Sequence, residues 1–231
     1  MTHSQTESKE AVVLEPSRTA RASVIWLHGL GADGYDFVPL VPELEVAGLD
    51  AVRFVFPHAP VRPVTLNGGL PMRAWFDVTG FDRNALQDEA GIRASDTAIR
   101  EWIAREEAAG VDSGAIVLAG FSQGGAMALF TGLRYPQQLA GIIALSTYLP
   151  LGATLGDEAS AANRDVPILM CHGRFDPIVG VDYGRRSHEH LASLGYSVDW
   201  REYPIQHEVS REEIDAISAW LGERLPAAGR Y

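Results

Sequence analysis

Ser122 is the residue whose neighbours point most directly to chemistry. It stands in Gly120-Phe121-Ser122-Gln123-Gly124-Gly125, where the apolar run 115–119 ends and the helix-like run 126–135 begins. A nucleophilic serine on a sharp strand-to-helix turn needs very small residues two positions to either side, because the backbone there is strained and closely packed. Gly120 and Gly124 meet this need, so the motif predicts a nucleophile elbow.

A serine hydroxyl also needs a base, and the base needs a third group that fixes its tautomer. After such an elbow an acid and then a histidine follow along the chain, each on a loop after a strand. Asp176 follows the apolar run 166–171, and Pro177 holds it in extended backbone outside any helix. His207 follows the β-rich run 197–203. We therefore predict His207 as the base and Asp176 as the acid that orients it.

The oxyanion of an acyl-transfer reaction requires preorganised donors. The backbone N–H of Gln123, at the start of the predicted helix, is one candidate. The second is the N–H of Leu30, in the glycine-rich segment 28–34 that follows the apolar run 23–27. Without the elbow, this segment would be only a glycine-rich turn.

Short β-rich runs alternate with longer helical patterns along the chain. This alternation predicts an α/β fold in which helices cover both faces of a mostly parallel sheet, and most runs are apolar throughout, as buried strands are. We expect strands at 11–14, 23–27, 51–56, 115–119, 141–145, 166–171 and 197–203, and helices at 37–46, 86–109, 123–135, 181–194 and 210–224. The segments 57–74 and 150–164 fit neither period, so we expect surface loops there. Loops of this length inside a compact domain often have a function. The second of them, 150–164, is a candidate lid.

Length and composition limit the classes of protein that fit. The 231 residues, 46% of them hydrophobic, predict a single domain over 1–231 with flexible ends at 1–10 and 226–231. A net charge of −11 opposes binding to nucleic acid. The chain begins with polar residues and has no apolar run near the roughly 20 residues of a membrane span, so we expect a soluble, cytoplasmic protein. Cys171 stands alone in an apolar run typical of a buried thiol.

Together these motifs resemble the family of small carboxylesterases, lysophospholipases and acyl-protein thioesterases among the α/β-hydrolases. The resemblance extends from about residue 23 to residue 224 and rests on His28-Gly29-Leu30-Gly31, Trp75-Phe76-Asp77, the Ser122 motif, His172-Gly173 with Asp176, and His207. It implies a serine hydrolase that uses Ser122, His207 and Asp176, with Leu30 and Gln123 as oxyanion donors. It further implies that no metal or cofactor is needed and that the protein forms a homodimer.

The acyl group of a small-molecule or lipid ester needs an apolar surface near the serine. The candidates are Met72, Trp75, Phe76, Leu149 and Leu151. For Met72 and Leu151 core packing is an equal alternative, because large apolar residues are buried by default. The length leaves no room for a cap domain, so we expect an open, shallow site.

The leading hypothesis is a serine carboxylesterase that hydrolyses short- to medium-chain esters through an acyl-enzyme. An acyl-protein thioesterase or lysophospholipase with the same residues is the close alternative, and an acyltransferase or perhydrolase would differ mainly in how water is excluded. A non-catalytic ligand-binding protein is the alternative from another class, since a fold alone does not give a function. The complete Ser, Asp and His order favours an enzyme.

Overall fold

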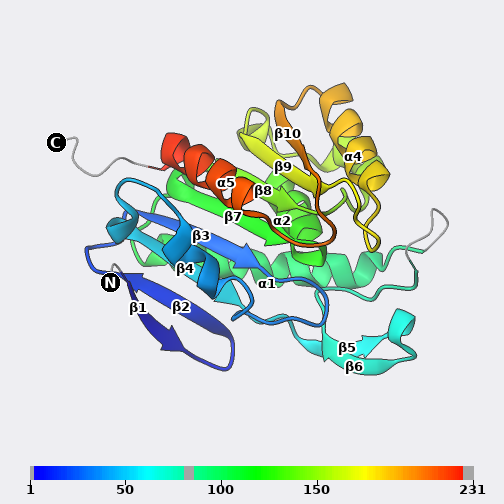
Figure 1. Cartoon of the computed structure of the whole chain (residues 1–231), viewed down its shortest axis with the longest axis horizontal. Coiled ribbons are helices and arrows are strands. Elements are labelled where there is room, and N and C mark those ends of the chain that lie inside the picture. Colours follow the sequence, from blue (N-terminus) through cyan, green and yellow to red (C-terminus); the bar gives the residue numbers. More distant parts are fainter. Residues whose placement is uncertain (1–2, 81–85, 226–231) are drawn as a thin grey trace.

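The centre of the protein is an eight-stranded sheet with the order β1-β2-β4-β3-β7-β8-β9-β10 (Figure 1). The computed structural model describes residues 3–80 and 86–225. The strands of this sheet are β1 (His3–Glu7), β2 (Ala11–Pro16), β3 (Ala22–Leu27), β4 (Val52–Pro57), β7 (Ile116–Phe121), β8 (Gly141–Leu145), β9 (Ile168–Gly173) and β10 (Val198–Tyr203). The six strands from β4 to β10 in this order are parallel, and β2 and β1 extend the sheet through antiparallel pairs.

Helices lie on both faces of this sheet. They are α1 (Glu89–Ala108), α2 (Gln123–Arg134), α3 (Leu155–Glu158), α4 (Val181–Ser193) and α5 (Arg211–Arg224). Figure 1 shows α5 in front of the sheet and α1 behind it. The N-terminal ends of α1 and α5 are capped by the side chains of Asp88 and Ser210, which accept the N–H of Gly91 and Glu213. The predicted α/β architecture is confirmed, with the ends of most elements shifted by a few residues.

Ser122 lies between β7 and α2, and α2 and the two strands that flank β7 are buried in the core. The strands β3 and β8 are buried at every residue, and so is α2 along its whole length. Such close packing holds the turn between β7 and α2 in one position. A nucleophile must be held in a defined position to react. Cys171 of β9 is also buried, and this burial raises the pKa of its thiol, as expected of a core cysteine.

Two predictions near the N-terminus are wrong. Residues 3–7, expected within a flexible end, form the edge strand β1, which pairs with β2. Most side chains of β1 are exposed, so the strand has no apolar alternation that would reveal it. The helix expected at 37–46 is a shorter 3-10 helix, Val38–Glu43, with Pro42 inside it, because proline cannot donate the backbone hydrogen bond that an α-helix needs. The predicted flexible end 226–231 lies outside the described residues.

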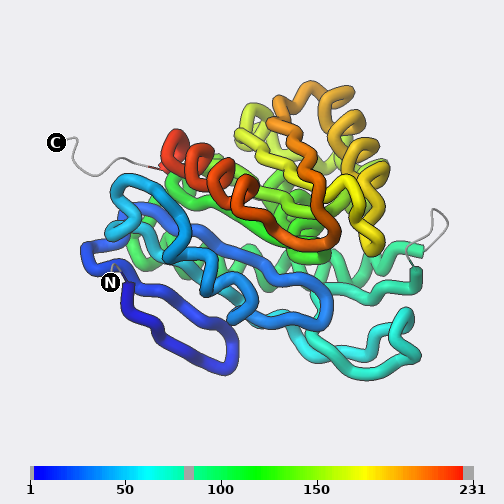
Figure 2. Tube along the Cα trace, in the orientation of Figure 1, coloured from blue at the N-terminus to red at the C-terminus, as the bar shows by residue number. Residues whose placement is uncertain are grey.

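Both predicted loops contain short regular elements. In 57–74, β5 (Val61–Val64) and β6 (Leu70–Arg73) form an antiparallel hairpin that projects away from the central sheet (Figure 2). Both strands contain proline and the turn contains two glycines, so the segment lacks the hydrophobic pattern that predicts strands. The segment 150–164 contains α3 and two 3-10 turns. In the described part of the chain, no helix combines the length and apolarity needed to cross a bilayer.

Candidate active site

Ser122 occupies the sharp turn between β7 and α2. Its φ of 53° and ψ of −120° are strained for a residue with a side chain. The backbone is held on both sides, because the Ser122 N–H donates to the Leu145 carbonyl at 2.8 Å and the Thr147 hydroxyl donates to the Ser122 carbonyl at 2.6 Å. The turn therefore has the backbone geometry expected of a nucleophile elbow.

The glycines around Ser122 are required by packing. A Cβ atom added at Gly120 would lie 2.3 Å from the backbone of Gly124, and one added at Gly124 would lie 2.1 Å from the carbonyl oxygen of Leu27. Real Cβ atoms essentially never approach closer than 3.0 Å, and backbone neighbours cannot rotate away as a flexible side chain can. The strand-to-helix turn can therefore form only with glycine at both positions.

Asp176 and His207 meet at the ends of β9 and β10. The Nδ1 atom of His207 lies 2.7 Å from Oδ2 of Asp176, while Oδ1 accepts the N–H groups of Ile178 and Val179 at 2.8 Å each. Burial acts to raise the pKa of Asp176, but the bonds from His207 and from these two N–H groups outweigh it, and the pKa is lowered. An ionised Asp176 keeps the ring proton of His207 on Nδ1, so Nε2 is the nitrogen available as a base.

A second histidine supports the turn that carries Asp176. His172 is fully buried, and its Nε2–H donates to the Val179 carbonyl at 2.7 Å and lies 3.6 Å from Oδ2 of Asp176. Burial lowers the pKa of His172, so the ring is neutral at neutral pH. The bond to Val179 closes the loop from residue 172 to residue 179 and thereby fixes the position of the acid.

The segment that contains Leu30 is fixed through His28. The Ala59 N–H donates to Nε2 of His28 at 3.0 Å, so the ring proton sits on Nδ1, which donates to the Gly29 carbonyl at 2.7 Å. Burial lowers the pKa of His28 to about 4, which keeps this tautomer neutral. The backbone on both sides of Leu30 is anchored, since the Gly31 N–H donates to the Arg73 carbonyl at 2.9 Å.

Gln123 links this site to the segment 75–76. It is the first residue of α2, so its N–H is one of the four at a helix start that have no acceptor within the helix. Its side chain accepts the Trp75 N–H and donates to the Phe76 carbonyl, both at 2.7 Å. The indole N–H of Trp75 donates to the His28 carbonyl at 2.9 Å. Through this bond the buried Trp75 side chain supports the segment that contains Leu30.

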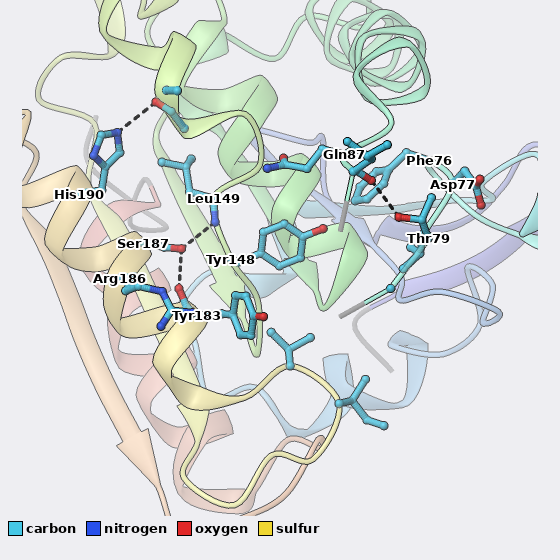
Figure 3. A pocket seen from close by; sticks show the side chains of 17 residues that line it. Phe76, Asp77, Thr79, Gln87, Tyr148, Leu149, Tyr183, Arg186, Ser187 and His190 are labelled. Atoms are coloured by element: carbon cyan, nitrogen blue, oxygen red, sulfur yellow. Dashed lines mark hydrogen bonds between the residues drawn. The ribbon is translucent and has the colours of Figure 1, made fainter. Parts of the chain in front are cut away.

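Two cavities meet at the site. Ser122, His207, Leu30 and Gln123 all line the smaller one, of about 210 Å³. The larger one, of about 400 Å³, shares five wall residues with it: Phe76, Val78, Tyr148, Ile178 and Val179 (Figure 3). The space beside Ser122 therefore extends further than the shallow site expected from the chain length.

The predicted acyl-binding residues divide between cavity wall and core. Phe76 lines both cavities and Leu149 lines the larger one. Trp75, Met72 and Leu151 are not among the described residues that line either cavity. Trp75 is 2% exposed, and Met72 and Leu151 pack against the core. Apolar wall residues and apolar core residues are of the same types, so composition does not separate them.

Several wall residues were missed in the sequence. Ile178 and Val179 belong to the turn that Asp176 organises, and the exposure of Ile178, at 44%, is unusual for isoleucine. Their position directly after the predicted acid was the available signal. Tyr148 carried no signal except its place beside Leu149.

The chain is similar to proteins described as carboxylesterases and acyl-protein thioesterases. Residues 8–224 match the model of the phospholipase/carboxylesterase family. The chain is 41% identical over 214 residues to acyl-protein thioesterase 1 of Neurospora crassa, covering 89% of this chain and 87% of that protein. It is 38% identical over 216 residues to acyl-protein thioesterase 1 of Yarrowia lipolytica, covering 91% of this chain and 95% of that protein.

The solved structures similar to this protein have the same fold. Arabidopsis thaliana SOBER1 superposes with a TM-score of 0.85 at 31% identity, covering 90% of this chain and 100% of that chain. Zea mays acyl-protein thioesterase 2 superposes with a TM-score of 0.83 at 33% identity, covering 93% of this chain and 98% of that chain. The fold is the α/β-hydrolase fold, and the chain belongs to the phospholipase/carboxylesterase family.

Proposed function

We propose that this protein is a serine hydrolase that transfers the acyl group of an ester or thioester to Ser122 and then to water. The observation that supports this most strongly is that Ser122, His207 and the two oxyanion candidates, Leu30 and Gln123, line one cavity, with Asp176 bonded to the far side of the His207 ring. A ligand-binding protein would need no such set.

The reaction follows from the roles that these groups can take. Nε2 of His207 accepts the proton of the Ser122 hydroxyl as Oγ attacks the acyl carbonyl carbon. The N–H groups of Leu30 and Gln123 stabilise the oxyanion, assisted by the positive end of α2. His207 then returns the proton to the departing oxygen or sulfur. Water repeats the sequence and releases the acid.

The walls suggest where the acyl chain lies. Phe76, Val78, Ile178 and Val179 are apolar and line both cavities, so a chain attached at Ser122 can continue from the smaller cavity into the larger one. Short- to medium-chain carboxylic esters are the proposed substrates. Acyl thioesters of proteins are the second candidate, favoured by the extra length that the larger cavity offers and by relatives named acyl-protein thioesterase 1.

The test is hydrolysis of p-nitrophenyl esters from acetyl to palmitoyl and of a long-chain acyl thioester, with Ser122→Ala as the control. We expect the alanine variant to lose at least about 10³-fold in kcat, because loss of the nucleophile removes the acyl-enzyme route. A preference for short esters supports the carboxylesterase, and a preference for the thioester supports the second candidate. Turnover retained by a folded Ser122→Ala variant would contradict the proposal.

A further inference from the structure

The larger cavity contains a positive charge that the hydrolysis of a neutral ester does not use. We propose that Arg186 forms a subsite for an anionic group, a carboxylate or a phosphate, on the substrate at a distance from the scissile carbonyl. This inference rests on the proposed function, because it concerns the substrate of the same site.

Arg186 belongs to α4 and lines the larger cavity. In Figure 3 it lies with Tyr183 and Ser187 on the α4 side, while Phe76 and Asp77 lie on the other side. The residue is half-buried. A ligand that enters from Ser122 past the shared walls therefore reaches a space bordered by this arginine.

The charge of Arg186 is not neutralised within the described residues. Its neighbour Arg185 donates to both carboxylate oxygens of Glu202 at 2.8 Å and contacts Asp182 at 3.2 Å. No carboxylate in the described ranges forms an ion pair with Arg186. The chain carries 30 acidic residues against 19 lysines and arginines. Among the described residues, the arginine beside the cavity therefore has no carboxylate partner.

The guanidinium of Arg186 packs on an aromatic ring. Its central carbon lies 4.6 Å from the centroid of the Tyr183 ring, so the ring supports one face of the group. The N–H groups at the edge of a guanidinium held against a ring can bind two oxygens of one carboxylate or phosphate. A lysine would provide the charge without this paired geometry.

Asp77 and His190, the other described wall residues that can carry a charge near neutral pH, have partners. Asp77 accepts the backbone N–H and the hydroxyl of Thr65 at 2.7 and 2.6 Å. The ring of His190 donates to the Gly152 carbonyl at 3.0 Å. Of the charged side chains on the described wall, Arg186 is the one whose charge is left for a ligand.

The test compares anionic and neutral substrates that are otherwise alike. One arm pairs the p-nitrophenyl monoester of a dicarboxylic acid with the neutral ester of equal carbon number, which places the anion at the end of the acyl chain. The other pairs lysophosphatidic acid with the monoacylglycerol of the same chain, which places the anion on the leaving group. For each pair the readout is the ratio of kcat/KM for the anionic over the neutral substrate.

We expect Arg186→Gln to lower this ratio at least about tenfold in one arm, since a charge-assisted hydrogen bond is lost, and that arm identifies where the anion lies. Arg186→Lys should keep part of the ratio. The matched control Arg185→Gln removes an equal charge one residue away, outside the cavity, and should leave both ratios unchanged. Ratios unaffected by Arg186→Gln in both arms, or lowered equally by Arg185→Gln, would overturn the proposal.

Binding measurements separate this proposal from the proposed function. Calorimetry of the anionic ester with Ser122→Ala, and with Ser122→Ala combined with Arg186→Gln, requires no turnover. Weaker binding by the double variant supports the subsite even if Ser122 proves not to be the nucleophile. Equal binding by the two proteins rejects the subsite even if Ser122 is the nucleophile.

Discussion

The proposed chemistry depends on which nitrogen of His207 carries the proton. The 2.7 Å contact with Asp176 holds that proton on Nδ1 and leaves Nε2 to accept the proton of Ser122. Because the acid also accepts two backbone N–H groups, its position is fixed before any substrate arrives. Asp176, the member of the three that lies farthest from the bond that breaks, is therefore already in place before the reaction.

Asp176→Asn tests this assignment with almost no change in shape. An asparagine amide that donates to Nδ1 favours the tautomer with the proton on Nε2, which cannot accept the serine proton, so we expect kcat to fall about 10⁴-fold. Steady-state kinetics beside a thermal melt provide the measurement. Asp182→Asn, on the exposed face of α4, is the control and should keep full activity. A rate close to that of the wild type in folded Asp176→Asn would show that the tautomer does not matter.

The polar residues of the candidate site could be predicted from the sequence, and the apolar ones only in part. Ser122, Asp176 and His207 were recognisable because their order along the chain and their places after strands are set by the fold. Trp75 and Met72 were predicted only from their size and hydrophobicity. Residues of cavity walls and of cores have both properties, so these properties do not tell the two apart. The bond from Trp75 to the His28 carbonyl is a tertiary contact that local sequence does not encode.

The helix α5 begins with a buried acid close to the loop of His207. Glu213 is the third residue of α5, and its side chain is fully buried. Burial raises the pKa of Glu213 to about 8, although the Ser210 N–H favours the ionised form. The folded protein therefore keeps a proton that the unfolded chain releases near its ordinary pKa of 4.5. By linkage, this group makes stability fall as the pH rises between these two values.

Glu213→Gln should remove this dependence. We expect the melting temperature of the wild type to drop between about pH 5 and pH 8 by more than that of the variant, and the variant to be the more stable protein at pH 8. The exposed neighbour Glu212→Gln serves as the control and should follow the wild type. Parallel melting curves of wild type and Glu213→Gln across this range would show that the buried carboxyl is not protonated in the folded state.

The elements that escaped prediction share a physical cause. The strand β1 is the edge of the central sheet, and β5 and β6 form a separate two-stranded hairpin in which each strand has a free edge. At such edges side chains need not be apolar and prolines are tolerated. The buried strands β3, β7 and β8 were evident because both of their faces meet helices or neighbouring loops. The hydrophobic pattern therefore located the buried strands of the central sheet and missed its edge strand β1 and the separate hairpin.

Across the molecule, the parallel sheet explains how distant residues form one site. Leu30, Ser122, Asp176 and His207 follow the carboxyl ends of β3, β7, β9 and β10. In a parallel sheet these ends lie along one edge, which is where ligands bind in folds of this type. The alternation of strands and helices thus predicted both the fold and the convergence of the site. The extent of the adjoining cavity could not be predicted, because it depends on how the loops after these strands pack together.

The most direct test of the central claim is covalent labelling with a fluorophosphonate, read by intact mass and peptide mapping. A serine activated by His207 attacks the phosphorus and retains the adduct, whereas an ordinary serine hydroxyl does not react. We predict one adduct per chain, located on Ser122, and none on Ser122→Ala. A wild-type protein that stays unlabelled, or that carries its adduct on another residue, would contradict the account.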